Sequence, residues 1–236
     1  MQTQFLLRSI FCFSLVMLFL AHTAQADEYS WNGPYVGIHI GGMFGDRDTR
    51  LVPGGYDTVF GPGSNPYGTF STSGFVGGML VGYNLKIMES LVVGLEFEGG
   101  GSTAQASITT SATAGWPANN KLSEDWNFRT RGRVGWAMGA WMPYVAGGLS
   151  VTRANLDLAL NCFGQYYTDS EAKTLAGFNI GGGVEYAVTS NIAVRVEYLY
   201  DDYGSSQIGT IKPDWNDRKF TSFNNSTFRL AASYLF

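Results

Sequence analysis

The chain has 236 residues and a formal net charge of −4. Charged residues make up only 14% of it, whereas ordinary soluble domains hold roughly 25%. Aromatic residues reach 15%, and 31 residues are glycine. Low charge argues against an ordinary soluble domain, and the absence of a basic cluster argues against nucleic acid as a partner.

The N-terminal segment 1–26 is predicted to be a secretory signal peptide. Arg8 precedes the apolar run IFCFSLVMLFL at 10–20, and Ala24-Gln25-Ala26 fits the small-x-small rule of signal peptidase. We therefore expect cleavage after Ala26 and one mature domain over 27–236.

The remainder holds no stretch near the ~18 consecutive apolar residues of a membrane helix. Cleavage would leave Cys162 as a single cysteine, so no internal disulfide is expected. Many aromatics, little charge and no apolar helix leave two all-β classes, a secreted β-sandwich and a transmembrane β-barrel.

Alternating apolar and polar residues predict strands in eight places along the chain. Each run is close to the ~9–11 residues of a tilted membrane strand. In chain order they lie at 35–44, 74–86, 91–102, 126–138, 143–154, 175–187, 191–203 and 223–236.

The connections between these runs alternate between short and long. Short turns follow the second, fourth and sixth runs, and long polar loops follow the first, third, fifth and seventh, at 45–73, 107–125, 155–174 and 204–222. This alternation is typical of a transmembrane barrel with short periplasmic turns and long extracellular loops. It favours an eight-stranded antiparallel barrel of a Gram-negative outer membrane with both termini periplasmic; the β-sandwich stays as the alternative.

The alternation also predicts which side chains point inward. In NIAVRVEYLY, Val194 and Val196 share one face, and Arg195 and Glu197 share the other. Since lipid contacts the apolar face, the charged face must line the lumen. The same phase places nine charged residues inside: Glu96, Glu98, Arg129, Arg131, Arg133, Glu185, Arg195, Glu197 and Arg229.

Five arginines and four glutamates are close to balance, and Asp201, in phase near the rim, would complete it. Because an unpaired buried charge is costly, we expect an ion-pair network that plugs the barrel. A conducting lumen, and hence a porin for ions or small solutes, is the alternative. Tight turns centred near 88, 140–141 and 189 further predict four facing pairs: Glu98–Gly78, Glu96–Leu80, Arg133–Gly148 and Arg195–Gly183.

Other residues suggest no chemistry. His39 is predicted to face the lumen with no serine and acid grouped beside it, as a small acyltransferase or deacylase would need. We expect no enzymatic activity, no cofactor and no metal site.

Aromatic residues near strand ends predict two girdles at the membrane interfaces: Trp126, Tyr198, Tyr200 and Phe228 on the loop side, and Trp136, Trp141, Tyr186 and Phe236 on the turn side.

Four stretches resemble a known family, namely WNGPYVGIHIG at 31–41, RTRGRVGWAMGAWMPYVAGGLS at 129–150, GGGVEYAVTSNIAVRVEYLYDDYG at 181–204 and FRLAASYLF at 228–236. They are similar to small OmpA-like outer-membrane barrels, especially the immunogenic and porin-family proteins of alphaproteobacteria. The resemblance implies an eight-stranded barrel, exposure as a surface antigen and a role in envelope integrity. It also implies contact with outer-membrane lipids and lipopolysaccharide, with haem or host-surface binding through loops as a further option.

The last strand ends in a pattern that resembles the signal read by the barrel-assembly machinery. Its residues are Leu230, Ala232, Tyr234 and Phe236, at alternate positions up to the final aromatic residue. A terminal strand with an unpaired edge can be joined by strand addition before the barrel closes.

Overall fold

The computed structural model describes residues 29–52, 68–111, 117–162, 165–207 and 218–236, so the predicted signal peptide and its cleavage site at Ala26 lie outside the described residues. The described residues form nine strands. Their bounds are β1 Gly33–Val52, β2 Gly68–Lys86, β3 Leu91–Ser102, β4 Gln105–Ser111, β5 Pro117–Trp136, β6 Trp141–Cys162, β7 Gln165–Ala187, β8 Ile192–Gln207 and β9 Arg218–Leu235.

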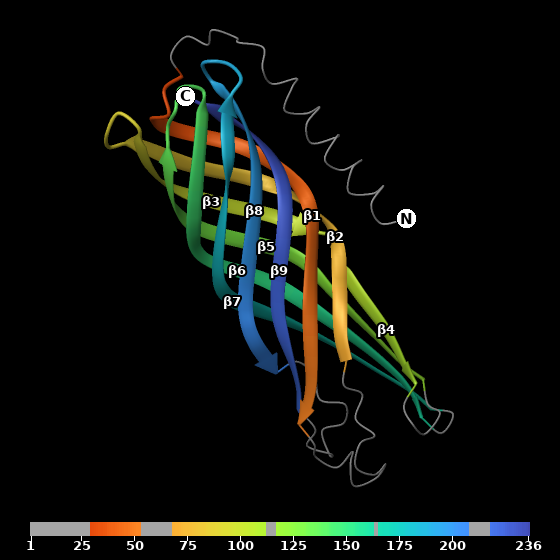
Figure 1. The fold of residues 1–236 in the computed structure, drawn as a ribbon. Coiled ribbons are helices and arrows are strands. Elements are labelled where there is room, and N and C mark those ends of the chain that lie inside the picture. The colour runs from red at the N-terminus through yellow and green to blue at the C-terminus, as the bar shows by residue number, and fades with distance from the viewer. Residues whose placement is uncertain (1–28, 53–67, 112–116, 163–164, 208–217) are drawn as a thin grey trace, which may run out of the picture.

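These strands close into one antiparallel barrel (Figure 1). The order is β1-β9-β8-β7-β6-β5-β3-β2, and β1 pairs with β2 to complete the ring. The short strand β4 takes over from β3 as the partner of β5, so the wall has eight positions. Ring closure leaves the barrel wall no free edge, and it rules out the β-sandwich. No helix among the described residues is long and apolar enough to span a membrane.

The two ends of the barrel differ. At one end, called here the turn end, tight connections join β2 to β3, β5 to β6 and β7 to β8, and β1 begins where β9 finishes. There the Phe236 amide donates to the Pro34 carbonyl oxygen at 3.1 Å. The other end, called the loop end, carries the connections that the sequence predicts to be long.

The strands run further toward the loop end than the sequence predicts. Within the segment 155–174, expected as a loop, the described residues 155–162 and 165–172 pair as the two arms of a hairpin, as far as Cys162 opposite Gln165. Beyond Asp202 on β8 and Ser73 on β2, the wall divides into two sheets, β8-β9-β1-β2 and β4-β5-β6-β7, which diverge in Figure 1. Outside lipid, both faces of such a sheet can contact water. The strands therefore need no apolar alternation, and a reading based on alternation ends them too early.

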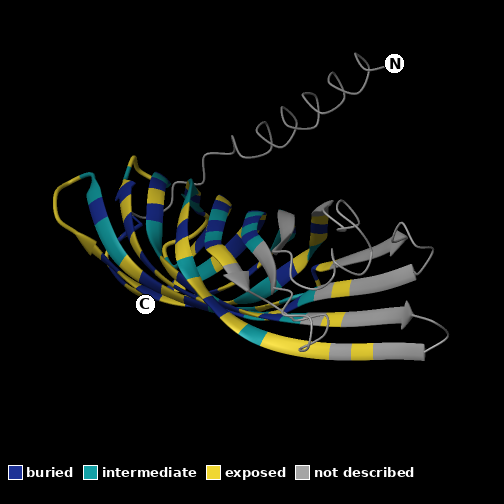
Figure 2. Ribbon diagram, turned by 90° about the horizontal axis from the view of Figure 1, so that it is seen from below, coloured by how far each residue is buried: buried dark blue, intermediate teal, exposed yellow. Residues whose placement is uncertain are grey.

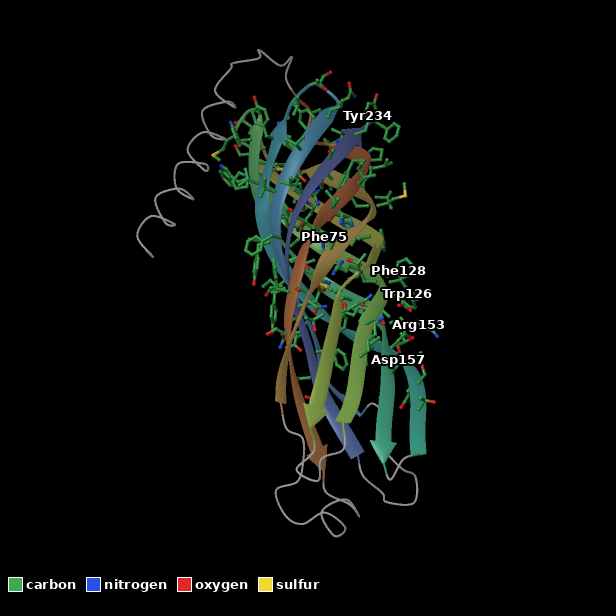
Figure 3. All side chains as sticks on the ribbon, turned by 90° about the vertical axis from the view of Figure 1, so that its right-hand side faces the viewer. Phe75, Trp126, Phe128, Arg153, Asp157 and Tyr234 are labelled. Carbon is green, nitrogen blue, oxygen red and sulfur yellow. The ribbon has the colours of Figure 1, made fainter. Side chains whose placement is uncertain are left out.

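Burial alternates along the barrel strands as predicted (Figure 2). Val196 is 60% exposed on the outer face, whereas Glu197 is 1% exposed inside. Outward aromatic pairs lie toward both ends of the barrel, with ring centroids 4.8 Å apart for Tyr198–Phe228 and 4.5 Å apart for Trp141–Tyr186. Figure 3 shows Tyr234 at the turn end and Arg153 and Asp157 on the extension beyond Phe128.

The predicted register is wrong by two residues at each tight turn. The turns centre on residue 89, between 139 and 140, and on residue 190, one position from the predicted centres. A shift of one residue in a turn centre moves the facing residue by two, which preserves the inward face but changes the partner. The observed pairs are Glu98–Leu80, Glu96–Gly82, Arg133–Ala146 and Arg195–Glu185.

Candidate functional site: the charged lumen

The nine charged residues predicted to face inward are all buried in the barrel, and so is Asp201. They come from five strands, with acidic residues on β3, β7 and β8 and arginines on β5, β8 and β9. With Asp201, five carboxylates meet five guanidinium groups, so the formal charge of this network is zero. The residues of the network are Glu96, Glu98, Arg129, Arg131, Arg133, Glu185, Arg195, Glu197, Asp201 and Arg229.

Arg131 holds the centre of the network, and its side chain is fully buried. Its Nη2 lies 2.6 Å from Glu98 and also contacts Glu96, while its Nη1 donates to Glu197 at 2.6 Å. One guanidinium thus joins carboxylates from β3 and β8. Charge-assisted hydrogen bonds of this kind are the strong class, and each carboxylate here gains several.

Two bidentate pairs close the network toward the loop end. Arg129 donates to both Asp201 oxygens, at 2.9 and 2.7 Å. Arg229 donates to both Glu98 oxygens, at 2.7 and 2.5 Å, and its Nε donates to Glu197 at 2.6 Å. The fork of a guanidinium matches the two oxygens of a carboxylate, which fixes the orientation of both groups.

Arg195 and Arg133 share two carboxylates toward the turn end. Arg195 lies 2.9 Å from Glu96 and donates from Nε to Glu185 at 2.5 Å, while Arg133 lies 2.9 Å from Glu185. The Arg133 guanidinium carbon sits 4.3 Å from the ring centroid of Tyr144. Such a stacked cation adds an attraction to the ring face that the sequence pattern does not reveal.

These contacts cross the lumen rather than follow its wall. In the ring of eight wall positions, β3 and β8 are four places apart in either direction, and Glu96 on β3 meets Arg195 on β8. Glu98 on β3 likewise reaches Arg229 on β9, three places away. Because an eight-stranded barrel has just enough interior for side chains to fill, contacts that bridge opposite walls occupy its cross-section.

Glycine makes room for these side chains. Gly148 faces Arg131 and Gly183 faces Glu197, and a Cβ at Gly148 would collide with the Thr130 carbonyl oxygen. The idea that long charged residues face glycine therefore holds, although the individual pairs differ from those the turns predict.

Further polar residues point into the lumen beside the predicted network. The Tyr35 hydroxyl donates to Glu96 at 2.8 Å, and at the loop end Asn225 donates to Glu124 at 3.1 and 3.0 Å across the barrel. Tyr35 shares the inward face of β1 with His39, as the sequence predicts, whereas Asn225 is not among the predicted inward residues. Asn225 stands in the inward phase of β9, so phase alone could have found it. Glu124 could not be found in this way, because a bulge between Glu124 and Asn127 shifts the phase of β5.

His39 is buried in the lumen, as predicted, and pairs across strands with Gly78 and Ala231. Neither of its ring nitrogens has a hydrogen-bond partner in the part of the chain that the structure describes. That arrangement offers no relay of serine, histidine and acid. The described residues also contain no group of three His, Cys, Asp or Glu side chains placed to hold a metal ion.

An apolar outer face, aromatic pairs toward both ends and a charged closed interior define a transmembrane β-barrel. The chain belongs to the family of the outer membrane protein beta-barrel domain, whose model matches residues 13–236. It is thus a β-barrel of the bacterial outer membrane, as the sequence resemblance implied.

Two relatives and one solved structure illustrate the likeness. The chain is 29% identical over 224 residues to the 31 kDa outer-membrane immunogenic protein of Brucella melitensis, covering 90% of this chain and 87% of that protein. It is 35% identical over 134 residues to the 22 kDa outer membrane protein of Rhizobium leguminosarum, covering 57% and 55%. The outer membrane protease OmpT of Escherichia coli superposes with a TM-score of 0.50 at 10% identity, covering 86% and 97%, which shows the fold alone.

Proposed function

We propose that this protein is a structural barrel of the Gram-negative outer membrane whose lumen is plugged by its Arg/Glu network. The observation that carries the proposal is the chain of buried ion pairs from Asp201 to Glu185 that joins opposite walls. In this role the protein supports envelope integrity without opening a general pore, and it has no enzymatic activity. The turn end faces the periplasm, so both termini are periplasmic and the two diverging sheets face outward.

Two features support a role as a surface antigen in contact with lipid. The extension beyond the aromatic belt carries exposed polar residues such as Arg153 and Asp157. Two groups of relatives are named immunogenic outer-membrane proteins. The outer apolar face of the barrel contacts membrane lipid, and the extension lies at the level of the lipopolysaccharide sugars.

Planar-bilayer recording tests the plug directly. A lumen crossed by ion pairs gives small or intermittent conductance, and liposome swelling shows no general diffusion of sugars. The control is an open porin reconstituted in the same lipid. A large and steady conductance of the unmodified protein would favour the alternative, a porin for ions or small solutes.

The C-terminal strand serves as the assembly signal in this proposal. Leu230, Ala232 and Tyr234 lie exposed on the outer face of β9, and Phe236, directly after the strand, is exposed as well. Deleting Phe236 lowers the folded fraction in cells, where the assembly machinery reads it, more than the folded fraction after refolding of purified protein in detergent. An equal loss in both settings would indicate a stability effect and no signal.

A second function, binding of a host surface or haem at the loop end, gains support from the divided wall. The pairing of β7 with β8 stops at Phe178–Asp202, so the part of β7 between 165 and 177 is paired only with β6 in the described residues. An open strand edge can accept an extended segment of another protein. The test is binding of matrix proteins and of haem to purified protein, before and after removal of residues 157–170. Binding that survives this deletion would argue against the hairpin as the site.

A further inference from the structure

The turn end of the lumen is closed by residues that precede the first strand. Tyr29 and Trp31 are only 9% and 3% exposed, although neither belongs to a strand. Their rings pack edge to face with centroids 4.4 Å apart. Both belong to a buried apolar cluster with Leu80 on β2, Val92 on β3, Met142 on β6, Ala187 on β7, Ala193 on β8 and Leu235 on β9. Members from six sides of the ring show that this cluster fills the mouth.

One hydrogen bond fastens the segment to the far side of the mouth. The Trp31 indole nitrogen donates to the Gly139 carbonyl oxygen at 3.0 Å, and Gly139 lies in the β5–β6 turn. In the ring order, β5 and β6 stand three and four places from β1. The bond therefore spans the opening instead of joining neighbouring strands.

Two glycines with positive φ make this arrangement possible. Gly33 has a φ of 132° where the chain passes from the mouth into β1, and Gly139 has a φ of 61° in the turn that accepts the bond. Other residues rarely adopt such angles. The side chain of Asn32, between Trp31 and Gly33 in the chain, accepts a hydrogen bond from the Lys86 amide at 3.0 Å, which ties the segment to the end of β2 as well.

We propose that Tyr29 and Trp31 form a seal at the turn end, a second barrier in series with the ion-pair network. This inference rests on the proposed plugged barrel and deepens it. Tyr35 joins the two barriers, because its ring lies in the apolar cluster and its hydroxyl donates to Glu96. In a series arrangement, loss of either barrier leaves the lumen closed, and only the loss of both opens it.

Four proteins separate the two barriers in planar-bilayer recordings: the parent, Tyr29→Ala/Trp31→Ala, Glu185→Ala/Arg195→Ala, and the combination. The second variant removes a facing ion pair together, so the change in formal charge is zero. We expect the first three proteins to keep the closed level and the combined variant to lose it. Trp136→Ala is the matched control, because this tryptophan stands on the outer face near the same end.

Each other outcome has a defined meaning. Steady conductance of Glu185→Ala/Arg195→Ala alone would overturn the seal and leave the network as the sole plug. Steady conductance of Tyr29→Ala/Trp31→Ala alone would overturn the proposed function of the network and leave the seal. A combined variant that keeps the closed level would overturn the seal, because the eight remaining charged residues of the network would then close the lumen without it.

A second measurement keeps the seal testable if the combined variant does not fold, as judged by whether its migration on a gel changes between unboiled and boiled samples. In the parent protein, the Trp31 indole N–H should exchange with solvent deuterium more slowly than the indole N–H of the exposed Trp136. Exchange of Trp31 as fast as that of Trp136 would show that the segment leaves the mouth, and the seal would be wrong.

Discussion

Strand β6 passes through two environments, and its residues differ accordingly. Within the barrel its inward side chains are buried, as Tyr144 and Ser150 are, and its outward side chains are apolar, as the highly exposed Leu149 is. On the extension, the exposed Arg153 and Asp157 follow along the same strand. Lipid and a narrow lumen constrain the two faces of the wall in opposite ways, whereas water accepts polar residues on both faces of the extension. Substitutions in the wall should therefore cost far more than equivalent ones in the extension.

The largest difference in stability between a wall substitution and an extension substitution should come from the centre of the ion-pair network. Arg131→Ala leaves Glu96, Glu98 and Glu197 with a lost partner in a desolvated site, so we expect about 3–5 kcal/mol of destabilisation. Arg153→Ala, which removes an exposed arginine on the extension, should change stability by less than about 0.5 kcal/mol. Urea unfolding in lipid vesicles measures the stability of both variants. Equal losses of unfolding free energy would mean that the lumen is well hydrated.

A charge added to the lipid face should have the next largest effect. Val196 stands on the outer face of β8, within the stretch from 193 to 202 that is paired with β7 in the barrel wall. Val196→Arg should cost about 2–4 kcal/mol, the penalty for a cation near the bilayer midplane. The matched change is Thr168→Arg, at an exposed position on the β7 extension. Urea unfolding in lipid vesicles again measures both variants. If Val196→Arg leaves the free energy of unfolding unchanged, the outer face of β8 does not contact lipid.

Loss of space in the lumen should cost less again. Gly148→Ala forces its new methyl group against the Thr130 backbone, so we expect roughly 1–3 kcal/mol. Gly132→Ala on the neighbouring strand is the control, because its Cβ would stay 3.9 Å from the Gly147 oxygen, an ordinary contact. Thermal unfolding in detergent should show a lower unfolding midpoint for Gly148→Ala and an unchanged one for Gly132→Ala.

The smallest expected difference concerns hydrogen exchange and needs no substitution. Backbone amides of β7 between 178 and 187 are flanked by paired strands on both sides, whereas those between 165 and 174 pair with β6 alone among the strands that the structure describes. A segment with fewer paired strands beside it opens locally at a lower free energy. The amides between 165 and 174 should therefore exchange with solvent faster. Uniform protection along β7 would show that the divided wall is closed in solution.

The amino-acid sequence by itself determined the parts of the barrel that lipid constrains. Because apolar residues must face outward and charged ones inward with a period of two, it placed Val196 outside, Glu197 inside and nine charged residues in one lumen. The eight alternating runs supplied the number of wall positions, and the alternating connection lengths distinguished the two ends.

Only the tertiary structure decided which groups meet. A turn centre displaced by one residue preserves every inward face and changes every partner, so alternation could not show that Arg195 faces Glu185. Contacts such as Glu98 with Arg229 join strands three places apart in the ring and depend on its closure. Tyr29 and Trp31 lie outside any strand, so the alternation of apolar and polar residues predicts nothing about their burial. Their burial follows from the shape of the mouth, which exists only once the barrel has closed.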